Sequence, residues 1–128
     1  MPKFEEGGKL SGFIDKETGV SGDMEFKDSF RIDGKFKGKI LSGTTLVIGE
    51  TGVVNADVQV KTVTVNGRLK GSIIAKGMVE ILSKGRVTGK IVCAKLIIED
   101  GAFFQGSCQM DLNPLENKEK VENGKIYK

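Results

Sequence analysis

The sequence predicts an all-β fold, a parallel β-solenoid in which each repeat of the sequence forms one turn of a coil. One apolar pattern starts five times between Phe30 and Met110, with a spacing of 16 or 17 residues. A fixed spacing of this kind is typical of repeat architectures. The chain also contains 18 Gly and only 2 Pro among 128 residues, which is consistent with many tight turns and disfavours helices.

The five repeats begin at Phe30, Leu46, Val63, Val79 and Leu96. Each reads apolar-x-apolar, a turn, and then apolar-x-small-x-apolar. This alternation places the apolar side chains on one face of short β-strands, and Val and Ile, which favour strands, dominate these positions. We therefore expect an apolar interior built from aligned columns of side chains.

Three columns follow the turn of each repeat, and the middle one holds only small residues. The first column is Phe36, Val54, Leu69, Val87 and Phe104. The small column is Gly38, Ala56, Gly71, Gly89 and Gly106. The third is Ile40, Val58, Ile73, Ile91 and Cys108. The turns alternate in length, because Gly34 and Gly67 lie in tight turns whereas 49–52 and 82–85 carry two more residues.

The first and last segments depart from this pattern. A weaker sixth repeat reads Val20-x-Gly22-x-Met24-x-Phe26, so the solenoid domain is expected to span residues 13–110. Residues 1–12 are short and polar, and residues 111–128 mix acidic and basic residues with few apolar ones. Both flanks are predicted to be flexible, disordered tails.

Enzymatic functions lack the residues that they need. The chain has no His, which excludes a Ser-His-Asp triad and a His metal site. Its two Cys, Cys93 and Cys108, lie on inward columns and form no CxxC pair, so they read as small core residues. No phosphate-binding glycine loop is present either. We expect no catalytic residue, no metal and no cofactor.

Targeting signals are also missing from the sequence. No stretch approaches the ~20 apolar residues of a membrane-spanning helix. The first residues, Met1-Pro2-Lys3-Phe4-Glu5-Glu6, have no hydrophobic core of a secretory signal. A cytoplasmic location is expected.

Outward positions contain two candidate surfaces. The first is a basic face of Lys35, Lys37, Lys39, Arg68, Lys70, Arg86 and Lys90. It could dock anionic lipid or another polyanion, or it could simply keep the strand surface soluble, with Asp57 interrupting the row. No outward aromatic ladder accompanies it, so nucleic acid is not expected as a partner. The second is a column of Leu41, Ile74 and Val92, a candidate lateral contact that isolated exposed apolar residues would also explain.

The functional prediction depends on the two ends of the coil. Each terminal turn of a solenoid exposes unpaired backbone groups and apolar core, which monomeric solenoids cover with a capping element. Neither flank of this chain reads as such a cap. Phe103 is expected to point outward and Phe104 inward in the last turn, and both are candidates for a polymer interface at the C-terminal end. Stacking at two ends of each subunit would generate a filament.

Four segments of this chain resemble the bactofilins, a family of bacterial polymer-forming cytoskeletal proteins. They are residues 30–38, residues 46–54, residues 65–71 and residues 101–106, and the likeness runs from about Gly12 to Met110. The resemblance implies a right-handed β-helix of about six turns with a triangular cross-section. It also implies nonpolar filaments that assemble end to end without nucleotide or metal. Many members resemble one another in a hydrophobic or basic N-terminal membrane motif, and Phe4-Glu5-Glu6 does not match it.

The function predicted from the sequence is therefore that of a bacterial cytoskeletal scaffold. The subunit would assemble with itself and serve cell-shape or cell-wall machinery, with cell-wall enzymes or membrane-anchored morphogenetic proteins as further partners. The alternative is a solenoid binding module whose basic face docks anionic lipid or cell-wall polymer. The two differ in whether the purified chain polymerises, and the second leaves open an association with the inner face of the cell membrane.

Overall fold

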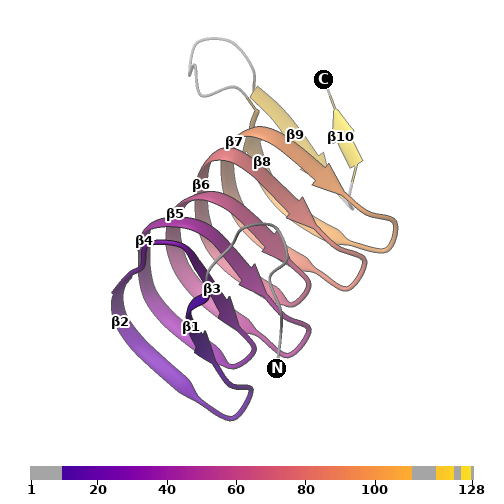
Figure 1. The fold of residues 1–128 in the computed structure, drawn as a ribbon. Helices are drawn as coiled ribbons and strands as arrows, with labels where there is room; N and C mark the ends of the chain where they lie inside the picture. The colour runs from indigo at the N-terminus through magenta and orange to yellow at the C-terminus, as the bar shows by residue number, and fades with distance from the viewer. Residues whose placement is uncertain (1–9, 111–117, 123–124, 128) are drawn as a thin grey trace.

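The computed structural model describes residues 10–110, 118–122 and 125–127, and these residues form β-strands without a helix. The strands are β1 (Leu10–Ile14), β2 (Gly19–Glu25), β3 (Ser29–Ile32), β4 (Lys35–Ile48), β5 (Val53–Val65), β6 (Arg68–Ile81), β7 (Arg86–Ile98), β8 (Phe103–Gln109), β9 (Lys118–Glu122) and β10 (Lys125–Tyr127). Figure 1 shows the long strands wrapped around a common axis, one above the other.

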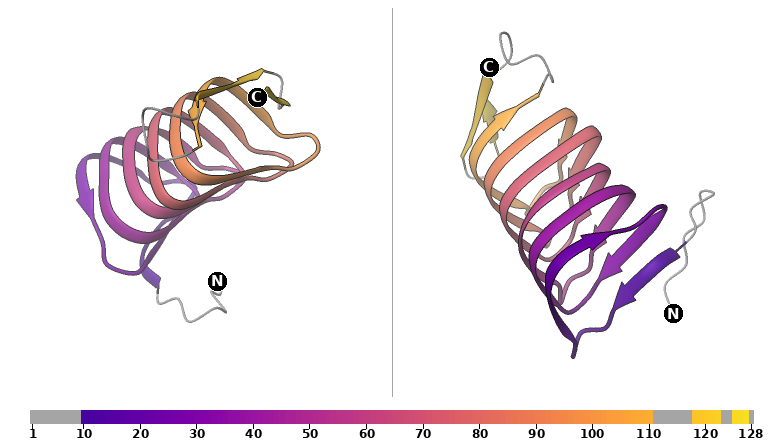
Figure 2. Two further views of the ribbon diagram at one scale, coloured as in Figure 1. Left: turned by 90° about the horizontal axis from the view of Figure 1, so that it is seen from above. Right: turned by 90° about the vertical axis from the view of Figure 1, so that its left-hand side faces the viewer.

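The strands pair in parallel from one turn to the next, which confirms the predicted parallel β-solenoid of about six turns. β3 and β2 pair with the two ends of β4, and β4 to β8 then follow in sequence order. Because each connection simply begins the next turn, neighbouring turns of the coil are also neighbours in the sequence. Figure 2 shows the resulting stack from two further sides.

Each turn presents one long face and two shorter ones. Face 1 consists of residues 35–41, 53–59, 68–74, 86–92 and 103–109, which pair in register. Face 3 consists of residues 29–32, 45–48, 62–65, 78–81 and 95–98. Face 2 is the stretch between them, where the register shifts in each turn, for example between Ala75 and Met78. The sheet bends at this irregularity, which allows one strand to serve two faces.

The interior is apolar, as the aligned columns predicted. Ile73 and Ile91 are fully buried, and Val87 is 1% exposed. Each of these side chains packs between the equivalent residues of the turns before and after it, since Val58, Ile73 and Ile91 are direct register partners. A parallel strand spacing of about 4.8 Å brings such side chains into contact. The core is therefore a continuous row of short apolar contacts along the coil axis.

The small column has a structural reason that alternation alone does not reveal. Gly71 and Gly89 have φ angles of 138° and 134°, a region that favours glycine. A Cβ atom on Gly89 would also collide with the backbone carbonyl oxygen of Gly71 in the preceding turn. Glycine is thus required at Gly89 for two reasons: its φ angle, and the close approach of the carbonyl oxygen from the preceding turn.

Strands are also present outside the predicted solenoid domain, residues 13–110. β1 begins at Leu10 and pairs with β3, so regular structure starts within the segment that was expected to be a tail up to residue 12. At the other end, β9 pairs antiparallel with β8, and β10 pairs antiparallel with β9. Residues 118–122 and 125–127 thus form strands within the segment 111–128, and the flexibility of that segment stays a prediction. Residues 1–9 and 111–117 lie outside the described residues.

Candidate assembly surfaces at the ends and sides of the coil

Among the described residues, no strand covers the N-terminal end of the coil. Two of its apolar side chains, Phe13 and Val20, are 41% and 40% exposed. Val20 belongs to an inward column, because it is the register partner of Phe36, which is 2% exposed. Val20 is therefore a core residue without a turn below it. The edge of β2 that faces away from β4 also has no partner strand among the described residues.

The C-terminal end has a different character. Phe104 is fully buried, as its inward column requires, and it is the register partner of Val87. Phe103 points outward and is partly exposed, with the guanidinium carbon of Arg86 5.7 Å from the centre of its ring. A cation over an aromatic face at this distance is a favourable contact. The orientations of the two aromatic residues agree with the sequence-based expectation, and their role in a polymer contact stays a prediction.

The outer edge of β8 is occupied by the chain itself. We call β9 and β10 together the C-terminal hairpin (Figure 1). Residues 106–109 of β8 pair in parallel with β7 on one side and antiparallel with β9 on the other. The sequence indicated no capping element on either flank, whereas β9 covers the outer edge of residues 106–109; that nothing beyond Met110 covers Phe103 and Phe104 stays a prediction. The sequence did carry a signal for the hairpin, because Asn123-Gly124 joins the two strands and this dipeptide is typical of two-residue hairpin loops.

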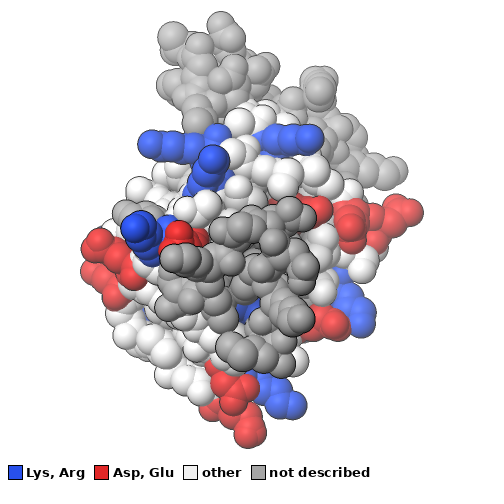
Figure 3. Space-filling view, in the orientation of Figure 1, with Lys and Arg blue, Asp and Glu red and all other residues white. Residues whose placement is uncertain are grey.

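The seven basic residues that were predicted to share one surface lie together on face 1. Lys35 heads one outward column, in which the later turns place Arg68 and Arg86, and Lys37 and Lys70 share the next column. All seven side chains are exposed. Within the described residues none of them forms an ion pair, and the neighbouring Asp57 accepts a hydrogen bond from Ser72 at 2.9 Å. In the orientation of Figure 1, by contrast, basic and acidic side chains are interspersed on the visible side (Figure 3).

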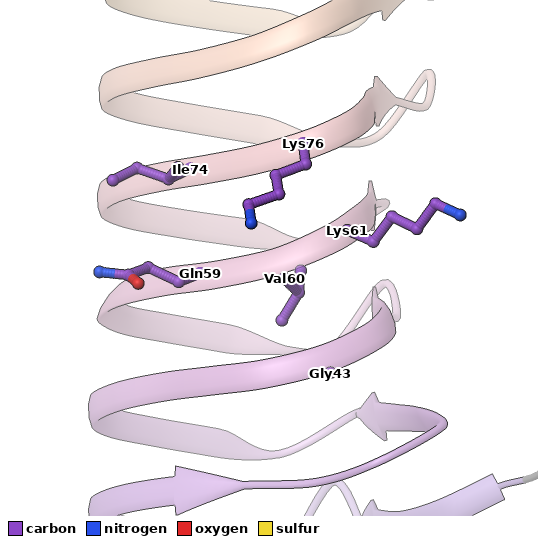
Figure 4. A pocket seen from close by; sticks show the side chains of 6 residues that line it. All are labelled: Gly43, Gln59, Val60, Lys61, Ile74 and Lys76. Atoms are coloured by element: carbon purple, nitrogen blue, oxygen red, sulfur yellow. The ribbon is translucent and has the colours of Figure 1, made fainter. Parts of the chain in front are cut away.

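The predicted lateral column also aligns in register. Leu41, Gln59, Ile74, Val92 and Gln109 follow one another where face 1 meets face 2. Leu41 and Val92 are partly buried, and Ile74 is 39% exposed. A shallow groove of about 400 Å³ adjoins this column, with Ile74 and Gln59 on one side and Lys76 directed toward the turn below it (Figure 4). No described segment of the chain packs over this column, so its role as a lateral contact stays a prediction.

The turns at the corner between face 3 and face 1 are closed by polar contacts. Lys84 donates a hydrogen bond to the Glu50 carboxylate at 2.8 Å across two turns. This hydrogen bond raises the pKa of Lys84, whose side chain is exposed. Thr51 donates to the carbonyl oxygen of Asp33 at 2.6 Å. These contacts link successive turns at the surface, where exposed ion pairs contribute little to stability.

Two further sequence-based expectations concern metals and membranes. In the described ranges no three His, Cys, Asp or Glu side chains gather as metal ligands would. Cys93 and Cys108 are buried and form no disulfide with each other. The part of the chain that the structure describes contains no helix with the length and hydropathy of a membrane span.

Comparison with known proteins decides which family this coil represents. The bactofilin family model, described as polymer-forming cytoskeletal, matches residues 12–109. The chain belongs to the bactofilin family. The curated bactofilin BacO of Myxococcus xanthus is 36% identical over 93 residues, which cover 73% of this chain and 74% of BacO. Bactofilin BacP of the same organism is 35% identical over 96 residues, and the match covers 40% of BacP.

Solved bactofilin structures show the same coil. The bactofilin of the double helical filaments of Thermus thermophilus, reconstructed by cryo-electron microscopy, superposes with a TM-score of 0.70 at 34% identity. That match covers 75% of this chain and 95% of the Thermus chain. The cytoskeletal bactofilin BacA, solved by solid-state NMR, superposes with a TM-score of 0.69 at 32% identity, covering 77% of this chain and 94% of BacA. The chain is thus a member of a cytoskeletal, filament-forming family that associates with itself.

Proposed function

We propose that this bactofilin forms cytoskeletal filaments by end-to-end stacking of its coils, without nucleotide or metal, and that the filaments scaffold cell-shape or cell-wall machinery. The observation that carries the proposal is the bare N-terminal turn. It combines an unpaired strand edge on β2 with Val20, a core-column side chain that is 40% exposed. A second coil placed against this turn would continue both the hydrogen-bond ladder and the apolar column.

The energetics of such a contact require no bound cofactor. Strand pairing satisfies the backbone groups of the β2 edge, and burial of the exposed apolar area removes it from water. The partners of the scaffold, cell-wall enzymes or membrane-anchored morphogenetic proteins, would then contact the faces of the coil, which end-to-end stacking leaves accessible.

Electron microscopy and pelleting of the purified full-length chain test this function. We expect filaments in plain buffer that are unchanged by ATP, GTP or EDTA. Val20→Arg should reduce pelleting strongly, because a desolvated charge at the apolar end is costly. Ser21→Arg, one residue further on the outward side of β2, is the matched control and should pellet like the parent. A parent chain that stays monomeric at high concentration contradicts the proposal.

A second candidate function is the docking of face 1 to the anionic inner surface of the cell membrane. It is favoured by the seven exposed cations that share this face without an ion pair within the described residues. Each basic residue near an anionic surface contributes about 1 kcal/mol. A filament that repeats the face would add these contributions along its length.

Vesicle sedimentation tests this second function. The basic-face variant, in which Lys35, Lys37, Arg68 and Lys70 are changed to Gln, should assemble normally. Filaments of the parent should sediment with vesicles that contain phosphatidylglycerol, less so at high salt, and filaments of the variant should not. Equal sedimentation of both proteins, or none by the parent, leaves face 1 as a surface that only confers solubility.

A further inference from the structure

The two ends of this coil are in different states. At the N-terminal end, the core-column residue Val20 is 40% exposed and β2 has one unpaired edge among the described strands. At the C-terminal end, Phe104 is fully buried and residues 106–109 of β8 are paired on both sides. Within the described residues, the N-terminal end is thus open to a second copy, whereas the C-terminal end is partly closed by the chain itself.

The pairing with β9 excludes any other strand from the same edge. The register joins Gly106 to Val121, Ser107 to Lys120, Cys108 to Glu119 and Gln109 to Lys118. A strand has only two edges, and β7 occupies the other one. The backbone groups of residues 106–109, which a stacked coil would need at this end, are therefore already in use.

The C-terminal hairpin also lies where the next turn of the coil would lie. The parallel order of turns ends at β8, and β9 follows in the sheet order in the place of a further turn (Figure 1). Its direction is reversed relative to β8, so it does not continue the solenoid but ends it. Covering the last strand with another segment of the chain is one of the ways in which proteins protect a sheet edge.

We propose that the outer edge of β8 is an interaction surface with two competing occupants, the C-terminal hairpin of the same chain and a second copy of the coil. Filament growth through this end requires that β9 leave β8, whereas contact through the N-terminal end requires no such opening. This inference rests on the proposed filament function. The population of the open state then sets the onset of assembly together with the affinity of the coil ends.

The size of the effect follows from that population. An apparent affinity falls by the fraction of molecules that are competent to bind. If the hairpin is closed in roughly nine molecules of ten, opening it permanently lowers the concentration needed for assembly about tenfold.

Two full-length variants test the competition in opposite directions. In the opened variant, Glu119→Pro and Lys120→Pro remove backbone donors from β9, and one of the two consecutive N–H groups points toward β8. Its matched control, Glu119→Gln with Lys120→Gln, removes the same charges and keeps both donors. In the locked variant, Ser107→Cys and Lys120→Cys face each other in the register, where Cα atoms about 5 Å apart permit a disulfide. The reduced form of the locked variant is its own control.

Pelleting and sedimentation velocity measure the outcome. We expect the opened variant to assemble at about one tenth of the concentration that its Gln control needs. The oxidised locked variant should stop at small particles joined through the N-terminal end, and reduction should restore filaments. Filaments from the oxidised locked variant that match those of its reduced form contradict the competition and leave the proposed function intact. If neither parent nor opened variant forms filaments, the proposed function fails, and the inference fails with it.

Discussion

Replacement of Gly89 by Ala separates the effect of backbone conformation from that of contact between turns. Gly22 and Gly89 have similar φ angles, 127° and 134°. A Cβ on Gly22 would meet nothing within 4 Å, whereas a Cβ on Gly89 would collide with the carbonyl oxygen of Gly71. Gly22→Ala is therefore a matched control that has the same kind of strain without the collision.

The expected magnitudes differ accordingly. Holding a non-glycine residue in this region of φ costs about 1–3 kcal/mol at either position. At Gly89 the turns must also separate locally, which leaves backbone hydrogen-bonding groups unsatisfied at a further cost of about 1–3 kcal/mol each. For a domain of this size one kcal/mol changes the melting temperature by roughly 4–8 °C. Gly89→Ala should thus melt on the order of 10 °C below Gly22→Ala.

Circular dichroism during heating provides the measurement, at a protein concentration below the onset of assembly so that polymer contacts do not contribute. The same two variants also report on filaments. The glycines of the later turns have their missing Cβ directed at the preceding turn, so Gly22→Ala would place a methyl group at the N-terminal end, where a second coil would stack. It should weaken assembly more than folding. Equal melting temperatures for the two variants would refute the argument that close approach between turns requires glycine.

Two further substitutions test the interior. Ile73→Asp should destabilise the coil by several kcal/mol, because a fully buried charge would have no partner, whereas Ile74→Asp at the adjacent exposed position should melt near the parent. Similar melting of the two would show that the inward assignment is wrong. Phe104→Arg should also lower the melting temperature, since this side chain is fully buried within the chain. If its stability equals that of the parent while filaments disappear, Phe104 acts in the polymer contact, as the sequence suggested.

The core and the register could be predicted because both follow from local alternation. Residues such as Ile73 and Val87 are inward in every turn that has the same pattern, and a shift of one residue would expose the whole set. The aligned basic residues on face 1 follow from the same register, since Lys35, Arg68 and Arg86 share one outward column. A repeated pattern thus predicts which side chains point into the core and which point outward.

The C-terminal end could not be predicted in this way because it departs from the repeat. The strand Lys118–Glu122 has no alternation of apolar and polar residues, so its pairing with β8 depends on backbone groups and on the turn that precedes β10. Only Asn123-Gly124 indicated a hairpin. The exposure of Val20 was also not evident from its column, since the sequence does not show which turn lacks a neighbour. Features of the two ends can be recognised only in the folded coil, where the first and last turns are known.

X-ray diffraction from oriented filaments of the purified chain tests the central claim, that the coils stack end to end. In such filaments the strands of every subunit lie across the filament axis, and their spacing of about 4.8 Å repeats along it. We predict a strong reflection at this spacing on the meridian, from filaments grown without nucleotide. A reflection at the same spacing that lies on the equator would mean that the coil axes run across the filament and that the coils associate side by side, which would contradict the account.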